Sequence, residues 1–191
     1  ELGATHRLLN YGVGGYGLDQ AVLLLERSLP HHLARAPLVV IGILIDDDLD
    51  RCALPLRDFP KPVYEWRADG LVLQPPPATS AREFVQTVPC GIESYLLRGF
   101  LGASGLLGSE FVRARVLAAA EREDLPRVAR ALLERAHALC ERAEVEHFFV
   151  LFHGRSAVKT RGPYTWREEL ACAAFTELGA PFVSSKRWLW E

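Results

Sequence analysis

The sequence predicts a single α/β domain, built as a three-layer α/β/α sandwich around a mainly parallel sheet. Two observations predict this fold class. Short apolar runs rich in β-branched residues alternate with longer segments whose apolar residues recur at helical spacing. The chain has 191 residues, enough to bury one sizeable core but few for two. We therefore expect one domain over residues 1–191.

The first quarter of the chain predicts a strand, a helix and a second strand. Residues 7–13 hold a short apolar run that ends in glycines, which favours a strand leading into a turn. Asp19 opens an amphipathic segment that reaches about residue 33, as its N-cap or as an acid of its first turn. Residues 38–45 read LVVIGILI, a run typical of a strand buried on both faces of a parallel sheet. Together they predict a βαβ unit.

Residues 54–77 differ in composition from the segments around them. Prolines stand near both ends of this stretch, and the runs VYEWR and LVLQ flank Ala68, Asp69 and Gly70. Two short apolar runs around such a turn predict a β-hairpin. We expect this hairpin to be an insertion into the core fold.

The rest of the chain predicts helices and two further strands. Helical spacing is found over residues 92–101, 110–122, 125–144 and 165–178. Thr165 is the expected N-cap of the last of these helices. Residues 147–152 read HFFVLF and predict another buried strand, and residues 181–184 begin the final one. This element order favours a parallel sheet.

Composition and charge exclude several kinds of binding partner for this chain. The net charge is -2 and acidic and basic residues are interleaved, so neither nucleic acid nor an anionic membrane is an expected partner. No apolar run reaches the length of a membrane span. The cysteines lie far apart without a C-x-x-C pair, which argues against a zinc site and against a dense disulfide scaffold. We also expect no metal and no cofactor. These cysteines are Cys52, Cys90, Cys140 and Cys172.

Three glycines in NYGVGGYGLDQ, Gly12, Gly14 and Gly17, match the G-x-G-x-x-G pattern of dinucleotide-binding proteins. Two features weigh against a bound pyrophosphate. The acid that contacts the ribose is expected about 20 residues on, but carboxylates at a strand end come only at residues 46–48. Asp19 also places a negative charge where the pyrophosphate would lie. The glycines otherwise indicate a tight turn, or a surface where a ligand approaches backbone N–H groups.

An acidic cluster and a histidine follow two of the predicted strands. Residues 46–50 read DDDLD, but the D-D-x-x-D magnesium motif belongs on a helix rather than after a strand. A calcium loop is excluded because Arg51 and Arg57 stand where glycine and glutamate are needed. A solvated acidic loop paired with these arginines is the alternative. His153 ends a strand at the same edge of the sheet, where it either lines a site or is a hydrogen-bonded loop residue.

These motifs together resemble the SGNH hydrolases, also called GDSL esterases and lipases. The pattern N-x-G-x-x-G-x-x-x-D-Q over residues 10–20 is followed by P-x-V-V-x-G and by D-D-L-D-R over residues 47–51. With Lys61-Pro62 and the D-G-L of residues 69–71, the chain is most similar to bacterial SGNH hydrolase-type esterase domain proteins. The likeness covers the N-terminal third well and the remainder only by element order.

The resemblance implies a flavodoxin-like fold and ester hydrolysis through an acyl-enzyme. In that family a serine and an Asp-x-x-His pair do the chemistry, and the oxyanion is held by the serine N–H, a glycine N–H and an asparagine side chain. Gly15 falls on the oxyanion glycine and Asp47 on the asparagine. Candidate binding residues around them are Asn10, Gly14, Asp48 and His153.

Two departures from the family pattern change the expected activity. An ionised Asp47 is an acceptor only and would repel an oxyanion, so it must be protonated or another group must supply the donor. The family's serine belongs upstream of Asn10 and its Asp-x-x-His downstream of residues 181–184. Because the chain also lacks methionine, we expect a segment of a longer gene product, incomplete at both ends and inactive alone.

A second hypothesis from another class is a non-catalytic SGNH-like module that binds a glycan, an acyl group or a protein. The acidic residues 46–50 favour it slightly. An ester substrate is the expected partner under the first hypothesis. Both hypotheses leave the compartment and the oligomeric state open.

Overall fold

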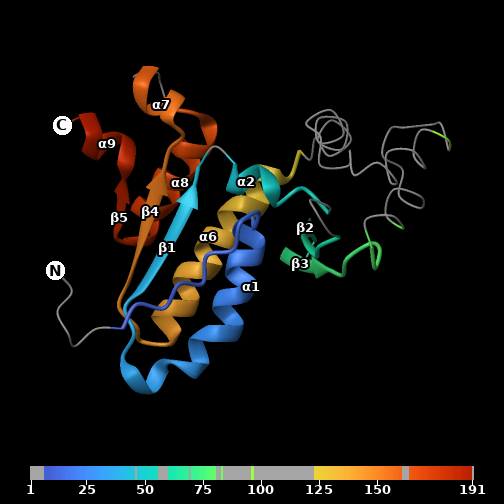
Figure 1. Ribbon diagram of the computed structural model, residues 1–191, viewed down its shortest axis with the longest axis horizontal. Helices are drawn as coiled ribbons and strands as arrows, with labels where there is room; N and C mark the ends of the chain where they lie inside the picture. Colours follow the sequence, from blue (N-terminus) through green and yellow to red (C-terminus); the bar gives the residue numbers. More distant parts are fainter. Residues whose placement is uncertain are drawn as a thin grey trace.

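Three parallel strands form the main sheet of the fold. The computed structural model describes residues 7–45, 47–55, 60–68, 70–80, 83, 96, 123–160 and 164–190. The sheet consists of β1 (Val39–Leu44), β4 (His147–Phe152) and β5 (Phe182–Ser184), in the order β1-β4-β5 (Figure 1). Both strand pairs are parallel, and Ile41 stands opposite Phe149. The prediction of an α/β fold with a parallel sheet is confirmed.

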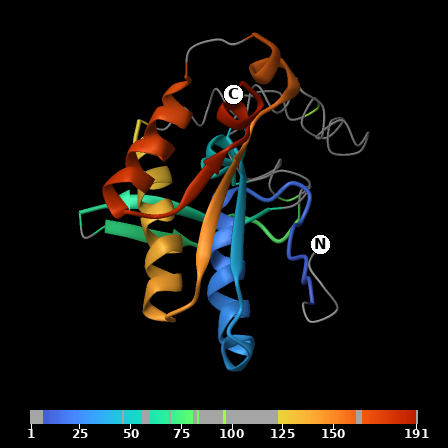
Figure 2. The same cartoon turned by 90° about the vertical axis from the view of Figure 1, so that its left-hand side faces the viewer.

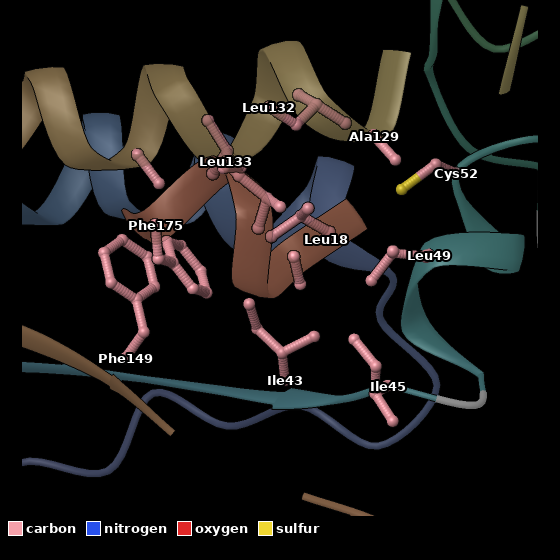
Figure 3. Close-up of a cluster of buried hydrophobic side chains, with 14 of the residues drawn as sticks. Leu18, Ile43, Ile45, Leu49, Cys52, Ala129, Leu132, Leu133, Phe149 and Phe175 are labelled. Atoms are coloured by element: carbon pink, nitrogen blue, oxygen red, sulfur yellow. The ribbon is translucent and has the colours of Figure 1, made fainter. Parts of the chain in front are cut away.

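Three helices cover one face of this sheet. They are α1 (Leu18–Ser28), α6 (Leu125–Arg142) and α8 (Trp166–Leu178), and α6 contacts both of the others (Figure 1). Figure 3 shows the core between helices and sheet, where the rings of Phe149 and Phe175 stack with centroids 4.3 Å apart. Further core side chains are Leu18, Ile43, Ile45, Leu132 and Leu133. Removal of this apolar surface from water is the main term that stabilises the fold.

The opposite face of the sheet is exposed among the described residues, and Figure 2 is drawn from this side. Burial alternates along the strands because successive side chains point to opposite faces. In β1, Ile43 is 1% exposed whereas Val40 is 53% exposed. Phe152 and Val183 are also exposed. The expectation that residues 38–45 form a strand buried on both faces is therefore wrong.

The segment before α1 contains neither helix nor strand, so the predicted strand over residues 7–13 is also wrong. Its side chains are exposed up to residue 14. Hydrogen bonds of local turns take the place of hydrogen bonds between strands. Asn10 Oδ1 accepts the N–H of Gly12 (2.9 Å), and the N–H of Tyr16 bonds the carbonyl of Val13 (3.2 Å). An apolar run alone does not form a strand without a paired neighbour.

Capping residues set the helix ends. α1 ends before Pro30, which cannot donate an N–H to the helical ladder, so the helix is shorter than expected. Two 3₁₀ turns follow, η1 (Leu29–His31) and η2 (Leu33–Arg35). Thr165 caps α8 as predicted, since its Oγ1 accepts the N–H of Glu168. Gly179, at φ 67°, ends the helix in the left-handed conformation.

The predicted hairpin is present and packs on α6. It consists of β2 (Val63–Arg67) and β3 (Gly70–Gln74), which pair antiparallel. Tyr64 is buried in the main core cluster, and the Arg127 guanidinium of α6 lies 5.4 Å from the centroid of the Trp66 ring. The hairpin thus belongs to the folded core rather than standing apart from it.

Short helices follow each strand of the parallel sheet. They are α2 (Asp48–Arg51) after β1, α7 (Arg155–Thr160) after β4 and α9 (Ser185–Trp190) after β5. None was expected from sequence, because such short segments carry too little periodicity to distinguish helix from loop. The helices predicted over residues 92–101 and 110–122 fall almost wholly outside the described residues.

Candidate functional site

The carboxyl ends of β1, β4 and β5 lie at one edge of the sheet, which we call the carboxyl edge. The N–H of Ile45 donates to the carbonyl of Phe152 (2.9 Å), so β1 and β4 end at the same level. Asp47 follows β1, His153 follows β4 and Ser185 follows β5. Ligands of open α/β sheets bind at this edge. Polar side chains from three separate parts of the chain are therefore brought to it, as the sequence predicted for Asp47 and His153.

Residues 12–17, the glycine loop, contact residues 47–51, the acidic turn. Arg51 Nη1 donates to the carbonyl of Tyr16 (3.1 Å). A Cβ placed on Gly17 would lie 2.7 Å from Arg51 Cβ and 3.1 Å from the carbonyl oxygen of Asp48. The third glycine of the motif is thus required for close packing of the two segments, which supports a structural reason for its presence.

Gly17→Ala is expected to lower the free energy of unfolding by about 1–3 kcal/mol, because an added methyl overpacks this contact. Gly14→Ala is the matched control, since a Cβ there meets nothing within 4 Å. Chemical denaturation of both variants measures the difference. Equal stability of the two variants would show that the loop and the turn are not in contact.

The described carboxylates of the acidic turn have partners within the protein. Asp47 forms an ion pair with Arg51. Asp48 accepts the N–H of Leu44 (2.8 Å) through one oxygen and Arg51 Nη1 (2.8 Å) through the other. Burial raises the pKa of Asp48, and the contacts with Leu44 and Arg51 partly offset this rise. Asp50 is bidentate with Arg167 of α8, at 2.8 and 2.7 Å.

These pairs make the acidic turn a structural joint between β1, the glycine loop and α8. The alternative of an acidic loop paired with arginines holds for Arg51, whereas Arg57 and Asp46 lie outside the described residues. Arg167, which the sequence did not suggest, is the other partner. A carboxylate bound in this way is not available to a metal or a cationic ligand without breaking its existing pair.

A buried ion pair lies at the start of α1. Asp19 and Lys61 are both almost fully buried and contact each other through Oδ2 and Nζ. Burial raises the pKa of Asp19, and Lys61 opposes the rise. Asp19 therefore occupies the first turn of α1 together with its own cation. The positive end of the helix dipole already has a carboxylate beside it, which leaves the dinucleotide hypothesis without support.

The second polar group at the carboxyl edge is the His153 cluster, formed by His153, Glu168, Ser185 and Lys186. His153 Nδ1 lies 3.1 Å from Ser185 Oγ, and its Nε2 lies 3.0 Å from Glu168 Oε1. Lys186 Nζ contacts the other oxygen of Glu168 at 3.3 Å. The side chains of His153, Glu168 and Lys186 are 1%, 2% and 3% exposed. The cluster ties β4, α8 and α9 together.

The order hydroxyl, imidazole, carboxylate in this cluster is that of a nucleophilic relay. His153 Nε2 and Glu168 Oε1 are within ion-pair distance but form no hydrogen bond. The contact between Nδ1 and the Ser185 hydroxyl is the hydrogen bond that the His153 ring makes among the described residues. The backbone N–H of His153 donates to the same hydroxyl oxygen (3.2 Å), which holds Ser185 in place. The imidazole is buried, so its contacts are those of a fixed internal network rather than of a base open to substrate.

Sequence reasoning identified His153 but not its three partners. Thr165 and Glu168 match the Thr-x-x-Glu pattern of a capping box, in which the glutamate turns back to the N-cap N–H. The carboxylate of Glu168 instead contacts His153 and Lys186. Both residues are close to Glu168 only in the folded chain, so no local pattern signals the cluster.

The remaining predicted site residues lie on the glycine loop and beside it. Asn10 is exposed and uses its side chain in a local turn. Gly14 is exposed, and Gly15 has a φ of 92°. Among the described contacts, Arg51 joins the loop to Asp47 and Asp48, whereas His153 belongs to the other group. The pair between Asp50 and Arg167 connects the two groups, since Arg167 precedes Glu168 on α8.

Comparison with known proteins assigns no family to this chain. No protein-family model matches it, and neither a curated protein nor a solved structure does. Among the helices of the described residues, none has the length and apolar character that crossing a bilayer requires.

Proposed function

We propose that this chain is part of a serine esterase of the SGNH type, which cleaves ester bonds through an acyl-enzyme at the carboxyl edge. The observation that carries the proposal is the contact between the glycine loop and the acidic turn, made through Arg51 and Gly17. The resemblance assigns oxyanion-binding groups to these two segments, so the proposal requires them to be neighbours. Their position beyond β1, where ligands of α/β sheets bind, supports it further.

Gly15 has the backbone geometry that the oxyanion role favours. Its φ of 92° is a conformation that other residues rarely adopt. A catalytic loop uses such a residue to direct a backbone N–H, which needs no side chain, toward a developing charge. The proposed role of Gly15 is to supply this N–H to the tetrahedral intermediate.

Asp47 is the residue of the proposed oxyanion hole that lacks the required hydrogen-bond donor. Its carboxylate faces Arg51, whose guanidinium also binds Asp48, so the positive charge is shared between two acids. In this ion pair the carboxylate of Asp47 is the acceptor, so it offers no donor to an oxyanion. Loss of one such donor typically lowers the rate by about 10²–10³. We therefore expect a low kcat for this enzyme.

Asp47→Asn is expected to raise kcat for p-nitrophenyl butyrate by about tenfold or more, because the amide restores a donor to the oxyanion. The measurement uses the full-length gene product. KM should change little, since the added bond forms in the transition state rather than in the ground state.

Asp50→Asn is the matched control. It removes a neighbouring carboxylate whose partner is Arg167 rather than Arg51, and kcat should stay within about twofold. If Asp47→Asn leaves kcat unchanged in an active enzyme, residue 47 is not part of the oxyanion hole. If the full-length product does not hydrolyse esters at all, the esterase proposal is wrong.

The three-layer flavodoxin-like sandwich is part of the same proposal. Val40, Phe152 and Val183 are exposed apolar side chains of the face that α1, α6 and α8 do not cover. Large apolar side chains exposed on one face of a sheet are often covered by another element. We propose that further helices of the full-length product cover this face. A structure of that product with this face open to water would contradict the three-layer fold.

The non-catalytic binding module is the second candidate. The acidic turn was the feature that favoured it, but Asp47, Asp48 and Asp50 are engaged with internal partners. The coding sequence on either side of the chain distinguishes the two candidates. Gly-Asp-Ser upstream with Asp-x-x-His downstream supports the esterase, and the absence of both blocks supports the binding module.

A further inference from the structure

Two histidines and a glutamate converge at the opposite end of β4 from the carboxyl edge. His137 and Glu141 are one helical turn apart near the end of α6, so their side chains lie on the same helix face. His147 is the first residue of β4. The turn that joins α6 to β4 brings its imidazole to this helix face. His153, after the end of β4, is six residues farther along, a distance of about 20 Å in a strand.

The potential ligand atoms of the three side chains lie close to one another. His137 Nδ1 lies 2.8 Å from His147 Nε2, and Glu141 Oε1 lies 3.9 Å from His147 Nδ1. One ligand atom from each residue can be chosen so that all lie within 4.8 Å of one another. His147 is buried, His137 is half-buried and the side chain of Glu141 is 62% exposed.

We propose that His137, Glu141 and His147 form a binding site for a divalent transition metal, with Zn²⁺ as its expected occupant. Imidazole nitrogens and a carboxylate oxygen are the ligands that zinc takes in protein sites. With three protein ligands, the fourth tetrahedral position is open to water. The site rests on this geometry alone and does not depend on the esterase proposal.

The hydrogen bonding of His147 orients it as a ligand. Its Nδ1 lies 3.2 Å from the carbonyl of Val145, so the Nδ1 proton is directed at the backbone and the Nε2 lone pair faces His137. Such a bond from the second ring nitrogen fixes the tautomer and the plane of a metal-bound histidine. A buried, preoriented imidazole therefore forms the fixed part of the site.

The other two ligands can adjust around it. At Zn–N distances of about 2.0–2.1 Å, two tetrahedral ligand nitrogens are about 3.3 Å apart. The present separation of 2.8 Å between the imidazole nitrogens is that of a hydrogen bond, so metal binding must separate them by roughly 0.5 Å. The proton shared between the two rings is that of His137 Nδ1. When the metal takes its place, this proton moves to Nε2 of His137 by exchange with solvent, so both rings stay neutral. Glu141 Oε1 lies beside Nδ1 of His147 rather than beside the Nε2 that binds the metal, so its exposed side chain must rotate to reach the ion.

The spacing of the cysteines argued against a zinc site. That spacing bears only on sites built from cysteine pairs, and not on sites built from histidine and carboxylate. The proposed ligands come from a helix and a strand that meet through a tight turn. The sequence shows His137 and Glu141 four residues apart, but His147 joins them only when the turn folds. A bound ion would fasten the end of α6 to the start of β4, which points to a stabilising role.

The test is a zinc titration of the 191-residue chain after removal of metals with a chelator. We expect binding of one equivalent of Zn²⁺, measured by competition with a chromophoric chelator, and a rise in Tm of several degrees. Co²⁺ in place of zinc should show the visible absorption of a four- or five-coordinate nitrogen and oxygen site. Binding of less than one equivalent, or no change in Tm, would overturn the proposal.

Variants locate the ion. His137→Gln and His147→Gln should each abolish stoichiometric binding, and Glu141→Gln should weaken it about tenfold or more. Glu141 is exposed, so its variant keeps the test valid even if a buried histidine variant does not fold. The matched controls are Glu134→Gln on the same helix and the double variant His31→Gln, His32→Gln. Loss of binding in a control, or its retention in His137→Gln, would place the ion elsewhere.

Discussion

Asp19→Ala is expected to lower the free energy of unfolding by about 3–5 kcal/mol, because it leaves the ammonium of Lys61 buried without its carboxylate. Both side chains of this pair are almost fully buried. A charge in this environment has no water to replace the lost partner. Urea denaturation monitored by circular dichroism measures the change.

The double variant Asp19→Leu, Lys61→Met separates the cost of the unpaired charge from the value of the pair. Apolar replacement of both partners is often neutral or stabilising, so the double variant should be more stable than Asp19→Ala. The surface pair of Glu65 and Arg67 is the control, and Glu65→Ala should change stability by about 0–1 kcal/mol. A similar small effect for Asp19→Ala would mean that the pair is open to water.

Glu168→Ala is expected to have an effect of the same size, a loss of about 3–5 kcal/mol, because its carboxylate contacts both Lys186 and His153 in the interior. The backbone at the carboxyl edge should also open more readily, because the cluster holds α8 and α9 against the end of β4. Hydrogen exchange of the amides of His153 and Ser185 should quicken in a variant such as Glu168→Gln that still folds.

Glu169→Ala is the control for this variant. Glu169 is the next residue of α8 and is exposed, so its removal should change stability by less than about 0.5 kcal/mol. Comparable losses at both positions would show that the effect comes from charge near the start of the helix rather than from the His153 cluster.

Much of the fold could be predicted because its core elements carry their own periodicity. Residues 147–152 form the predicted strand without change of bounds, and α6 and α8 match their predicted spans closely. Residues 7–13 show the limit of this reasoning. Their apolar run would form a strand only beside a partner, and a pairing partner is not a local property of sequence. The same limit explains why one open sheet face was not foreseen.

The candidate site could likewise be predicted only in part. The sequence predicted the glycine loop and the acidic turn at one edge of the sheet. The two segments are in contact, although the strand expected before the glycine loop is not present. The sequence did not predict the ion pairs that fix these segments, because Asp19 is 42 residues from Lys61 and Asp50 is 117 residues from Arg167. Charge pairing over such separations depends on how the helices pack. The carboxylates that suggested a ligand site are thus largely part of the framework.

Active-site labelling of the full-length gene product tests the esterase proposal most directly. A fluorophosphonate probe reacts with an activated serine, and mass spectrometry of the digested protein identifies the residue. The proposal predicts one adduct, on a serine that precedes Asn10 in the gene product, together with loss of ester hydrolysis. No adduct, or an adduct on Ser185 in the His153 cluster, would contradict it.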